Sequence, residues 1–158
     1  MNGPAVTGGP ELALACDFLV PSERAGLVDA HARVGVMPGR GLTVALPEAV
    51  GLRRAREMNA TGNFIGARTA LEWGLVNHVV PHEELIGFTR KLAAGIASAD
   101  PAAARATFGT YDQAAQIAGG PARQVEARAH AKWHAEGIDA GQVASRREAV
   151  IRRCRSQM

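Results

Sequence analysis

The chain has 158 residues, 47% of them hydrophobic but only 4% aromatic, which suffices for one domain with a core built from Ala, Leu and Val. No uninterrupted apolar run reaches membrane length and no basic-plus-apolar leader follows Met1, which argues against a membrane partner and favours a cytoplasmic protein. The net charge is only +3, and the two cysteines, Cys16 and Cys154, are too far apart in sequence to favour a disulfide framework or a zinc ribbon.

Residues 2–17 form the stretch around which we expect the chain to be organised, a glycine turn that leads into a helix. Gly8 and Gly9 can take backbone angles closed to other residues and allow close approach of a ligand, and Pro10 suits the first helical position. Glu11 then lies beside free amides that favour developing negative charge, which predicts an oxyanion site with an adjacent acid or base. The alternative is an ordinary turn in which Glu11 only complements the helix dipole.

The apolar residues that follow have the spacing of a buried helix face, and Cys16 is expected to serve in core packing. The predicted face consists of Leu12, Ala15, Cys16 and Leu19.

Short strands and helices are predicted to alternate up to residue 80. The expected strands are Asp17–Val20, Gly26–Asp29 and Val76–Val80, with a turn at residues 21–24 between the first two. The expected helices are Gly41–Leu46, stopping near Pro47, then Leu52–Ala60, then Ala67–Trp73 with Gly74 as its C-cap.

From His82 onward the pattern predicts helices only. An apolar stripe over residues 85–96 predicts the first, and a second is expected to start after Asp100 with Pro101 in its first turn. Gly119-Gly120-Pro121 is expected to break this second helix, and two more helices are expected to follow, the last after Gly141.

Residues 121–155 carry eight Lys or Arg against four Asp or Glu, a surplus of +4. This segment is interpreted either as a solvated helix surface or as an attraction for an anion such as coenzyme A phosphates. A nucleic-acid partner is disfavoured, because the chain has one Tyr, two Trp and no recognised nucleic-acid motif.

Residues 2–17 resemble the segment Asn-Gly-x-Ala-x-Gly-Gly-Gly-x-Glu-Leu-Ala-x-x-Cys-Asp of the enoyl-CoA hydratase/isomerase (crotonase) family. Further matches follow in the same order up to about residue 98: Gly35-Val36-Met37-Pro38-Gly39, Leu46-Pro47, Val50-Gly51, Ala55-Arg56-Glu57-Met58, Thr61-Gly62 and Ala70-Leu71-Glu72-Trp73-Gly74-Leu75-Val76-Asn77. Beyond residue 98 the match is weaker, with Glu136-Gly137-Ile138 resembling the C-terminal helix region of the family.

The resemblance implies an α/β fold, the C-terminal portion of the crotonase ββα superhelix, ending in a helical segment. Residues 1–98 would form the C-terminal part of the crotonase-like core, and residues 99–158 the helical C-terminal segment of the same domain. In the family, the first oxyanion amide and much of the coenzyme A surface come from a segment before the part matched here. We therefore expect a truncated member, or a chain begun at an internal position.

The resemblance also assigns the site. Gly8 matches the oxyanion donor, with Gly9 beside it, and Glu11 matches the first catalytic glutamate. Thr7 and Pro10 depart from the triple glycine and the following cysteine of the family, and neither removes the donor.

The second glutamate of the family is absent, because Ala30-His31 stands where the family has Pro-Glu. His31 can act as an acid or base near neutral pH and so replace it, with Asp29 contributing, or it is only a hydrogen-bonded loop histidine. Residues 29–35 follow a pattern, Asp-x-His-Ala-Arg-Val-Gly, that resembles some bacterial members, so the change is interpreted as marking a subgroup.

The function implied is addition of water to 2-enoyl-CoA thioesters in fatty-acid or acyl-CoA metabolism. The alternatives are an enoyl-CoA isomerase, an acyl-CoA hydrolase, and a catalytically incomplete crotonase-like subunit. Coenzyme A enters as part of the substrate and no separate cofactor is expected, while a homo-oligomer, trimer or hexamer, is implied by the family.

A metal site is not expected. His130 and His134 are four residues apart on a predicted helix, as zinc ligands can be, but the sequence offers no obvious third ligand.

Overall fold

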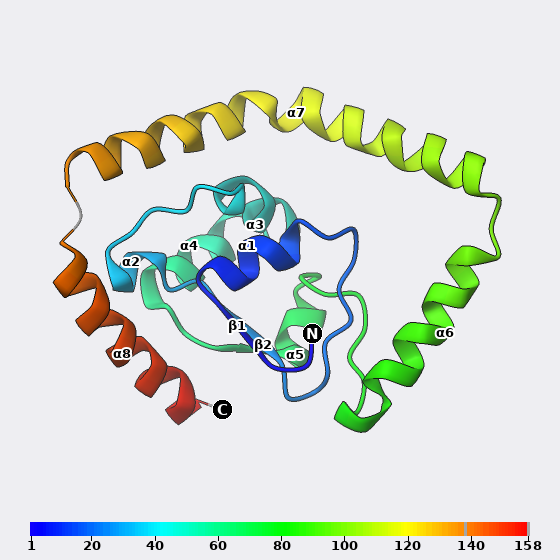
Figure 1. Cartoon of the computed structure of the whole chain (residues 1–158), viewed down its shortest axis with the longest axis horizontal. Helices are drawn as coiled ribbons and strands as arrows, with labels where there is room; N and C mark the ends of the chain where they lie inside the picture. The colour runs from blue at the N-terminus through cyan, green and yellow to red at the C-terminus, as the bar shows by residue number, and fades with distance from the viewer. Residues whose placement is uncertain (138, 158) are drawn as a thin grey trace.

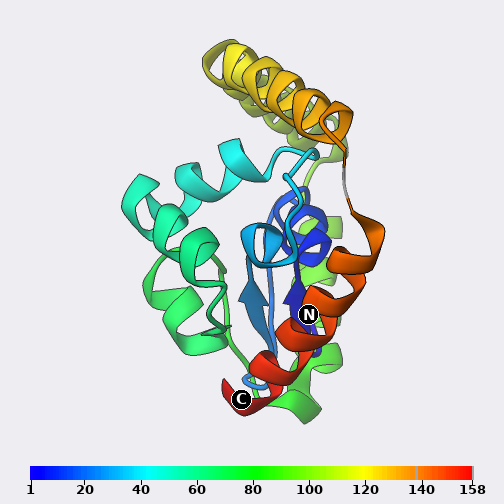
Figure 2. The ribbon, with the colours of Figure 1, turned by 90° about the vertical axis from the view of Figure 1, so that its left-hand side faces the viewer.

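The computed structural model describes residues 1–137 and 139–157, so Ile138 and its part of the weaker C-terminal match lie outside the described residues. A small sheet stands at the centre, with helices packed around it and a long helix arching over one end (Figures 1 and 2). Its strands are β1 (Pro4–Val6), β2 (Gly26–Val28) and β3 (Ile65–Gly66), in the order β1-β2-β3. The pair β1–β2 is parallel, with Ala5 opposite Leu27, and the pair β2–β3 is antiparallel.

The helices on the body of the fold are short. They are α1 (Gly8–Leu14), α2 (His31–Val34), α3 (Leu42–Val50), α4 (Leu52–Thr61) and α5 (Ala67–Glu72). Apolar residues of α1, α3, α4 and α5 form the main core with Leu27 of the central strand, and Leu42 and Met58 are among its most deeply buried side chains. The core thus holds both α1 and the start of α3 in place.

The C-terminal part is helical, as expected. A 3₁₀ turn (His82–Glu84) leads into α6 (Leu85–Ala97), followed by α7 (Pro101–Ala135) and α8 (Ala140–Gln157). Asp100 caps α7 by accepting from the amides of Ala102 and Ala103, with Pro101 at the first helical position. The division of the chain at residues 98 and 99 stays a prediction.

The predicted break at Gly119-Gly120-Pro121 is wrong, because α7 runs through all three residues. The predicted stop near Pro47 is also wrong, since α3 continues to Val50. A proline inside a helix removes one N–H and strains the preceding turn, which bends or weakens the helix without always ending it. The Pro47 carbonyl still accepts from the Gly51 amide at 2.9 Å.

Two predicted strands are not formed. Around residues 17–20 and 76–80, only Ser22 and Val80 make an isolated parallel bridge. The Leu19 amide donates to the side chain of Asn77 at 2.8 Å, while the Asn77 amide donates to the Leu19 carbonyl. A side chain therefore takes the place of the backbone acceptor that a β-ladder needs.

The turn before α1 differs from the prediction in its backbone. The left-handed φ belongs to Thr7, at 57°, and not to Gly8 or Gly9. Gly8 is the first helical residue, so Pro10 is the third and not the first. Gly9 instead allows close packing, since a Cβ there would lie 3.0 Å from the Cβ of Ala5 on β1.

The predicted buried face of the first helix is wrong for three of its four residues. Leu12 is 74% exposed, and Ala15 and Cys16 are exposed too, so Cys16 does not pack in the core. Leu19 is buried in the core as predicted, but it lies beyond the end of α1. The helix buries Pro10, Glu11 and Ala13 instead. The rotation of α1 on the sheet thus turns a carboxylate inward, where it needs polar partners.

Among the residues that the structure describes, no helix is long and apolar enough to cross a membrane.

Candidate functional site

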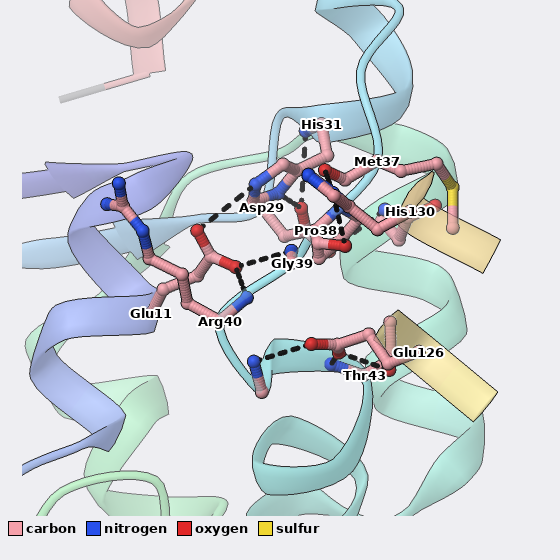
Figure 3. Close-up of polar contacts among 12 residues, drawn as sticks. Glu11, Asp29, His31, Met37, Pro38, Gly39, Arg40, Thr43, Glu126 and His130 are labelled. Atoms are coloured by element: carbon pink, nitrogen blue, oxygen red, sulfur yellow. Dashed lines mark hydrogen bonds and ion pairs between the residues drawn. The ribbon is translucent and has the colours of Figure 1, made fainter. Parts of the chain in front are cut away.

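Glu11 is the buried carboxylate of α1, with only 7% of its surface exposed. Its Oε1 accepts hydrogen bonds from the backbone amides of Gly39 at 3.1 Å and Arg40 at 2.9 Å (Figure 3). Both donors lie on the loop before α3, which comes 28 residues later in the chain. Two amides stabilise the negative charge at one oxygen and leave Oε2 for another partner.

That partner is His31, the first residue of α2. Its Nε2 lies 3.7 Å from Glu11 Oε2, and its Nδ1 lies 2.7 Å from Oδ1 of Asp29, which follows β2 directly (Figure 3). All three side chains are buried. The end of β2 and the start of α2 therefore place the Asp29–His31 pair against the carboxylate of Glu11 on α1.

Asp29 is held in its charged form. It also accepts from the His31 amide at 3.2 Å and from Asn59 Nδ2 at 2.9 Å. Burial raises the pKa of Asp29, but the hydrogen bonds from His31 and Asn59 and the attraction of His31 together hold that pKa below its ordinary value. A charged Asp29 fixes the Nδ1–H of His31 and so turns Nε2 toward Glu11.

The contact between Glu11 and His31 brings together two groups that can each accept a proton. With Nδ1–H directed at Asp29, Nε2 presents a lone pair to a carboxylate oxygen, and two acceptors repel unless a hydrogen lies between them. At 3.7 Å the two atoms are beyond hydrogen-bond distance, so the contact is a close approach of two buried groups and not a hydrogen bond. The arrangement can hold one acid and one base side by side in a buried place.

Gly8 lies next to this pair. A Cβ built on Gly8 would touch Glu11 Oε2 at 3.8 Å, so the first amide of α1 and the carboxylate are neighbours. Within residues 1–137 and 139–157, neither the Gly8 amide nor the Gly9 amide has a hydrogen-bond acceptor. A free amide at a helix start can donate to an oxygen on which negative charge develops.

A cavity of about 590 Å³ opens onto Glu11 between α1, α3 and α7. Its walls include Leu14, Leu42, Phe108 and Tyr111, with Arg40 and Arg123 at its edge. It has the size and the mixed polar and apolar lining of a small-molecule site.

The structure thus brings together Gly8, Gly9, Glu11 and His31, whose roles stay predictions from the sequence. Sequence reasoning missed Asn59 and the amides of Gly39 and Arg40. The motif Gly35-Val36-Met37-Pro38-Gly39 marked this loop without suggesting a role, and nothing around Asn59 distinguishes it from other exposed helix positions.

No group of three or more His, Cys, Asp or Glu is placed to hold a metal ion in the part of the chain described here. His130 and His134 contact each other edge to face, and His130 Nδ1 lies 3.1 Å from the Met37 carbonyl. The ring of His130 is thus engaged with the loop that carries the Glu11 donors.

Comparison with known proteins gives a consistent result. Residues 1–144 match the family model described as Enoyl-CoA hydratase/isomerase. A probable peroxisomal enoyl-CoA hydratase 1 of Arabidopsis thaliana is 44% identical over 96 residues, which is 61% of this chain and 36% of that protein. Carnitinyl-CoA dehydratase of Escherichia coli is 39% identical over 111 residues, 70% of this chain and 42% of that protein.

Solved structures agree with this result. Enoyl-CoA hydratase from Mycobacterium smegmatis matches with a TM-score of 0.84 at 45% identity, over 86% of this chain and 62% of that one. The enzyme from Mycobacterium tuberculosis matches with a TM-score of 0.85 at 42% identity, over 87% and 62%. The chain thus spans about three fifths of these solved chains, and less of the two curated relatives. With the crotonase fold present in part and ending in helices as expected, the chain belongs to the enoyl-CoA hydratase/isomerase family.

Proposed function

We propose that Glu11 and His31 are the acid–base pair of an enoyl-CoA hydratase site that adds water to 2-enoyl-CoA thioesters. The observation that carries this proposal is the buried contact between Glu11 Oε2 and His31 Nε2, beside the unpaired amide of Gly8. Hydration needs one group to accept a proton and another to supply one, and this pair can hold both states.

In the proposed reaction the thioester carbonyl oxygen accepts a hydrogen bond from the Gly8 amide. One member of the pair removes a proton from water as its oxygen bonds to C3, and the other donates a proton to C2. The π electrons pass through an enolate-like state whose charge rests on the carbonyl oxygen, so a preorganised amide lowers the barrier by several kcal/mol. The site has the same number of protons before and after the reaction.

The role given to His31 differs from the two-glutamate arrangement implied by the family resemblance. Asp29 supports this role, because it fixes the tautomer and stabilises an imidazolium if one forms. A histidine held by a carboxylate is a competent proton carrier near neutral pH. The resemblance assigns a second carbonyl donor to a segment before the matched part of the family.

The test is hydration of crotonyl-CoA by the protein with single substitutions. Glu11→Gln keeps the shape of the side chain but removes the base, and the expected loss of kcat is about 100-fold or more. Glu72→Gln is the matched control, since Glu72 is exposed at the end of α5, away from the site. His31→Ala is expected to lower kcat by a similar factor.

The other outcomes decide between the remaining functions. Conversion of 3-enoyl-CoA without hydration supports an isomerase, and release of free coenzyme A thiol supports a hydrolase. Absence of all three activities overturns the proposed function and supports a catalytically incomplete subunit. Activity that is present but unchanged in Glu11→Gln overturns the proposed role of Glu11.

We also propose that the chain functions as a homo-oligomer. Apolar side chains lie exposed along α7, among them Tyr111, Ile117 and Val125. Surfaces of this kind are commonly buried between subunits.

A further inference from the structure

Side chains near the C-terminal end of the long helix α7 form hydrogen bonds with a segment of the candidate site. Glu126 and His130 contact the loop 35–41 and the start of α3 (Figure 3), and Trp133 contacts the start of the same loop. This loop supplies the amides that hold Glu11. We infer that Glu126 is a positioning residue for Glu11, acting through this loop. The inference rests on the function proposed above for Glu11 and adds to it a residue 115 positions away in sequence.

Glu126 is the buried acid of a mostly exposed helix, with 5% of its surface accessible. Its Oε1 accepts from the Gly41 amide at 2.5 Å, and its Oε2 accepts from the Thr43 amide at 2.7 Å and from the Thr43 hydroxyl. A surface glutamate would be free in water, so burial with three donors gives this one a specific structural task.

The order of the amides along the loop is the central observation. Gly39 and Arg40 donate to Glu11, and Gly41 and Thr43, the latter in the first turn of α3, donate to Glu126. Four of the five residues from Gly39 to Thr43 are therefore held by two buried carboxylates, one on α1 and one on α7. Because neighbouring peptide planes are linked, a shift at Gly41 rotates the amides offered to Glu11.

Two further contacts fix the preceding half of the loop to α7. His130 Nδ1–H donates to the carbonyls of Met37 at 3.1 Å and Pro38 at 3.2 Å. Trp133 Nε1–H donates to the Gly35 carbonyl at 3.2 Å. A Cβ on Gly39 would lie 2.5 Å from His130 Nδ1, so only glycine lets the helix approach this closely.

The consequence for the proposed reaction is geometric. Proton transfer is sensitive to displacements of about 1 Å, which can cost about 100-fold in rate. Loss of the Glu126 contacts frees the loop, and Glu11 loses the fixed donors that orient its second oxygen toward His31.

The test combines residue-resolved amide exchange by NMR with kinetics, on the wild-type chain and on Glu126→Gln. The variant keeps the size of the side chain but places an NH₂ against a backbone donor. Exchange at the Gly39 and Arg40 amides, which do not touch Glu126, is expected to accelerate about tenfold or more. In the crotonyl-CoA assay, kcat is expected to fall about tenfold while KM changes less than about twofold. Glu136→Gln, at the exposed C-cap residue directly after the same helix, is the matched control.

Faster exchange at Gly41 and Thr43 alone, with Gly39 and Arg40 unchanged, overturns the inference, because Glu126 would then only cap α3. If exchange is also faster in β2, Glu126→Gln has destabilised the whole fold. The milder variant Thr43→Val then decides whether the Glu126 contacts position the Gly39 and Arg40 amides. That variant removes only the hydroxyl bond and must accelerate exchange at Gly39 and Arg40, less strongly. If the wild-type chain shows no hydratase activity, the proposed function fails, whereas the exchange result still decides whether Glu126 positions Glu11.

Discussion

At the scale of single residues, the site depends on which groups contact the oxygens of each buried carboxylate. Glu11 divides its oxygens between two amides and a histidine, and Asp29 divides its own between that histidine and Asn59. Each group has at least two partners, which offsets the cost of taking a charge out of water. Removing one partner should therefore affect both stability and proton transfer.

The lowered pKa of Asp29 makes the stability of the fold depend on pH. Since its folded pKa lies below the unfolded value of about 3.9, the charged form contributes stability that is complete above that value and is lost as pH falls through the folded pKa. Asp29→Asn should therefore reduce the decline in the free energy of unfolding as pH falls below about 3.9. Urea unfolding across this range measures it, with exposed Asp17→Asn as a control. Equal slopes for wild type and Asp29→Asn would contradict the assignment.

Thr7 carries backbone strain before α1, since φ 57° and ψ −102° suit glycine and not a β-branched residue. Thr7→Gly is expected to raise the free energy of unfolding by about 1 kcal/mol, because the relieved strain exceeds the added entropy of the unfolded chain. Thermal unfolding measures the change. Thr110→Gly, within helix α7, should have the opposite sign. If Thr7→Gly instead lowers the free energy of unfolding, other interactions of Thr7 in the fold compensate for its backbone strain.

At the scale of elements, α8 supports the strand end that carries Asp29. Figures 1 and 2 show α8 descending along one side of the fold, beside α2. Its Val150 and Cys154 are buried in a cluster with Val28, Ala30 and Val34. Ala30 lies between Asp29 and His31, so the helix packs directly behind the acid–imidazole pair. Burial also raises the pKa of the Cys154 thiol, with partial opposition from Arg153.

Val150→Ala should lower the free energy of unfolding by about 2 kcal/mol, since it removes buried methyl groups and leaves a cavity. Ile151→Ala removes more atoms from a side chain that is 50% exposed, and it should cost less. Denaturant unfolding of the two variants measures the difference. If Ile151→Ala is the more damaging change, α8 does not pack on this cluster in solution.

At the scale of the whole molecule, α7 arches over the body and contacts it chiefly through α3 and the loop 35–41 (Figure 1). Much of its length lies away from the core (Figure 1), and Ile117 is 83% exposed. Apolar surface of this extent is unfavourable in water, and contact with further chains of the same kind would cover it.

We expect light scattering to give a multiple of the 16.6 kDa chain mass, and Ile117→Glu to reduce that mass by placing a charge in the contact. Arg105→Glu, an exposed charged position on the same helix, serves as the control. A wild-type mass equal to one chain would contradict the proposed assembly.

The sequence alone determined the family, the helical character of the C-terminal part and the nearness of Glu11 to a free helix amide. These features depend on local patterns, such as the Asp100-Pro101 helix start, and on motifs repeated in order. The site pair was also partly predictable, since His31 occupies the position of an expected acid or base.

Only the tertiary structure decided the rest. The rotation of α1 that buries Glu11 instead of Leu12, the loss of two predicted strands, and the partners Asn59 and Glu126 all depend on segments distant in sequence. A backbone amide can bond to any acceptor that packing brings near, so no local pattern specifies its partner. Whether a helix continues past a proline also depends on contacts with distant segments, so Pro121 alone could not show that α7 continues past it.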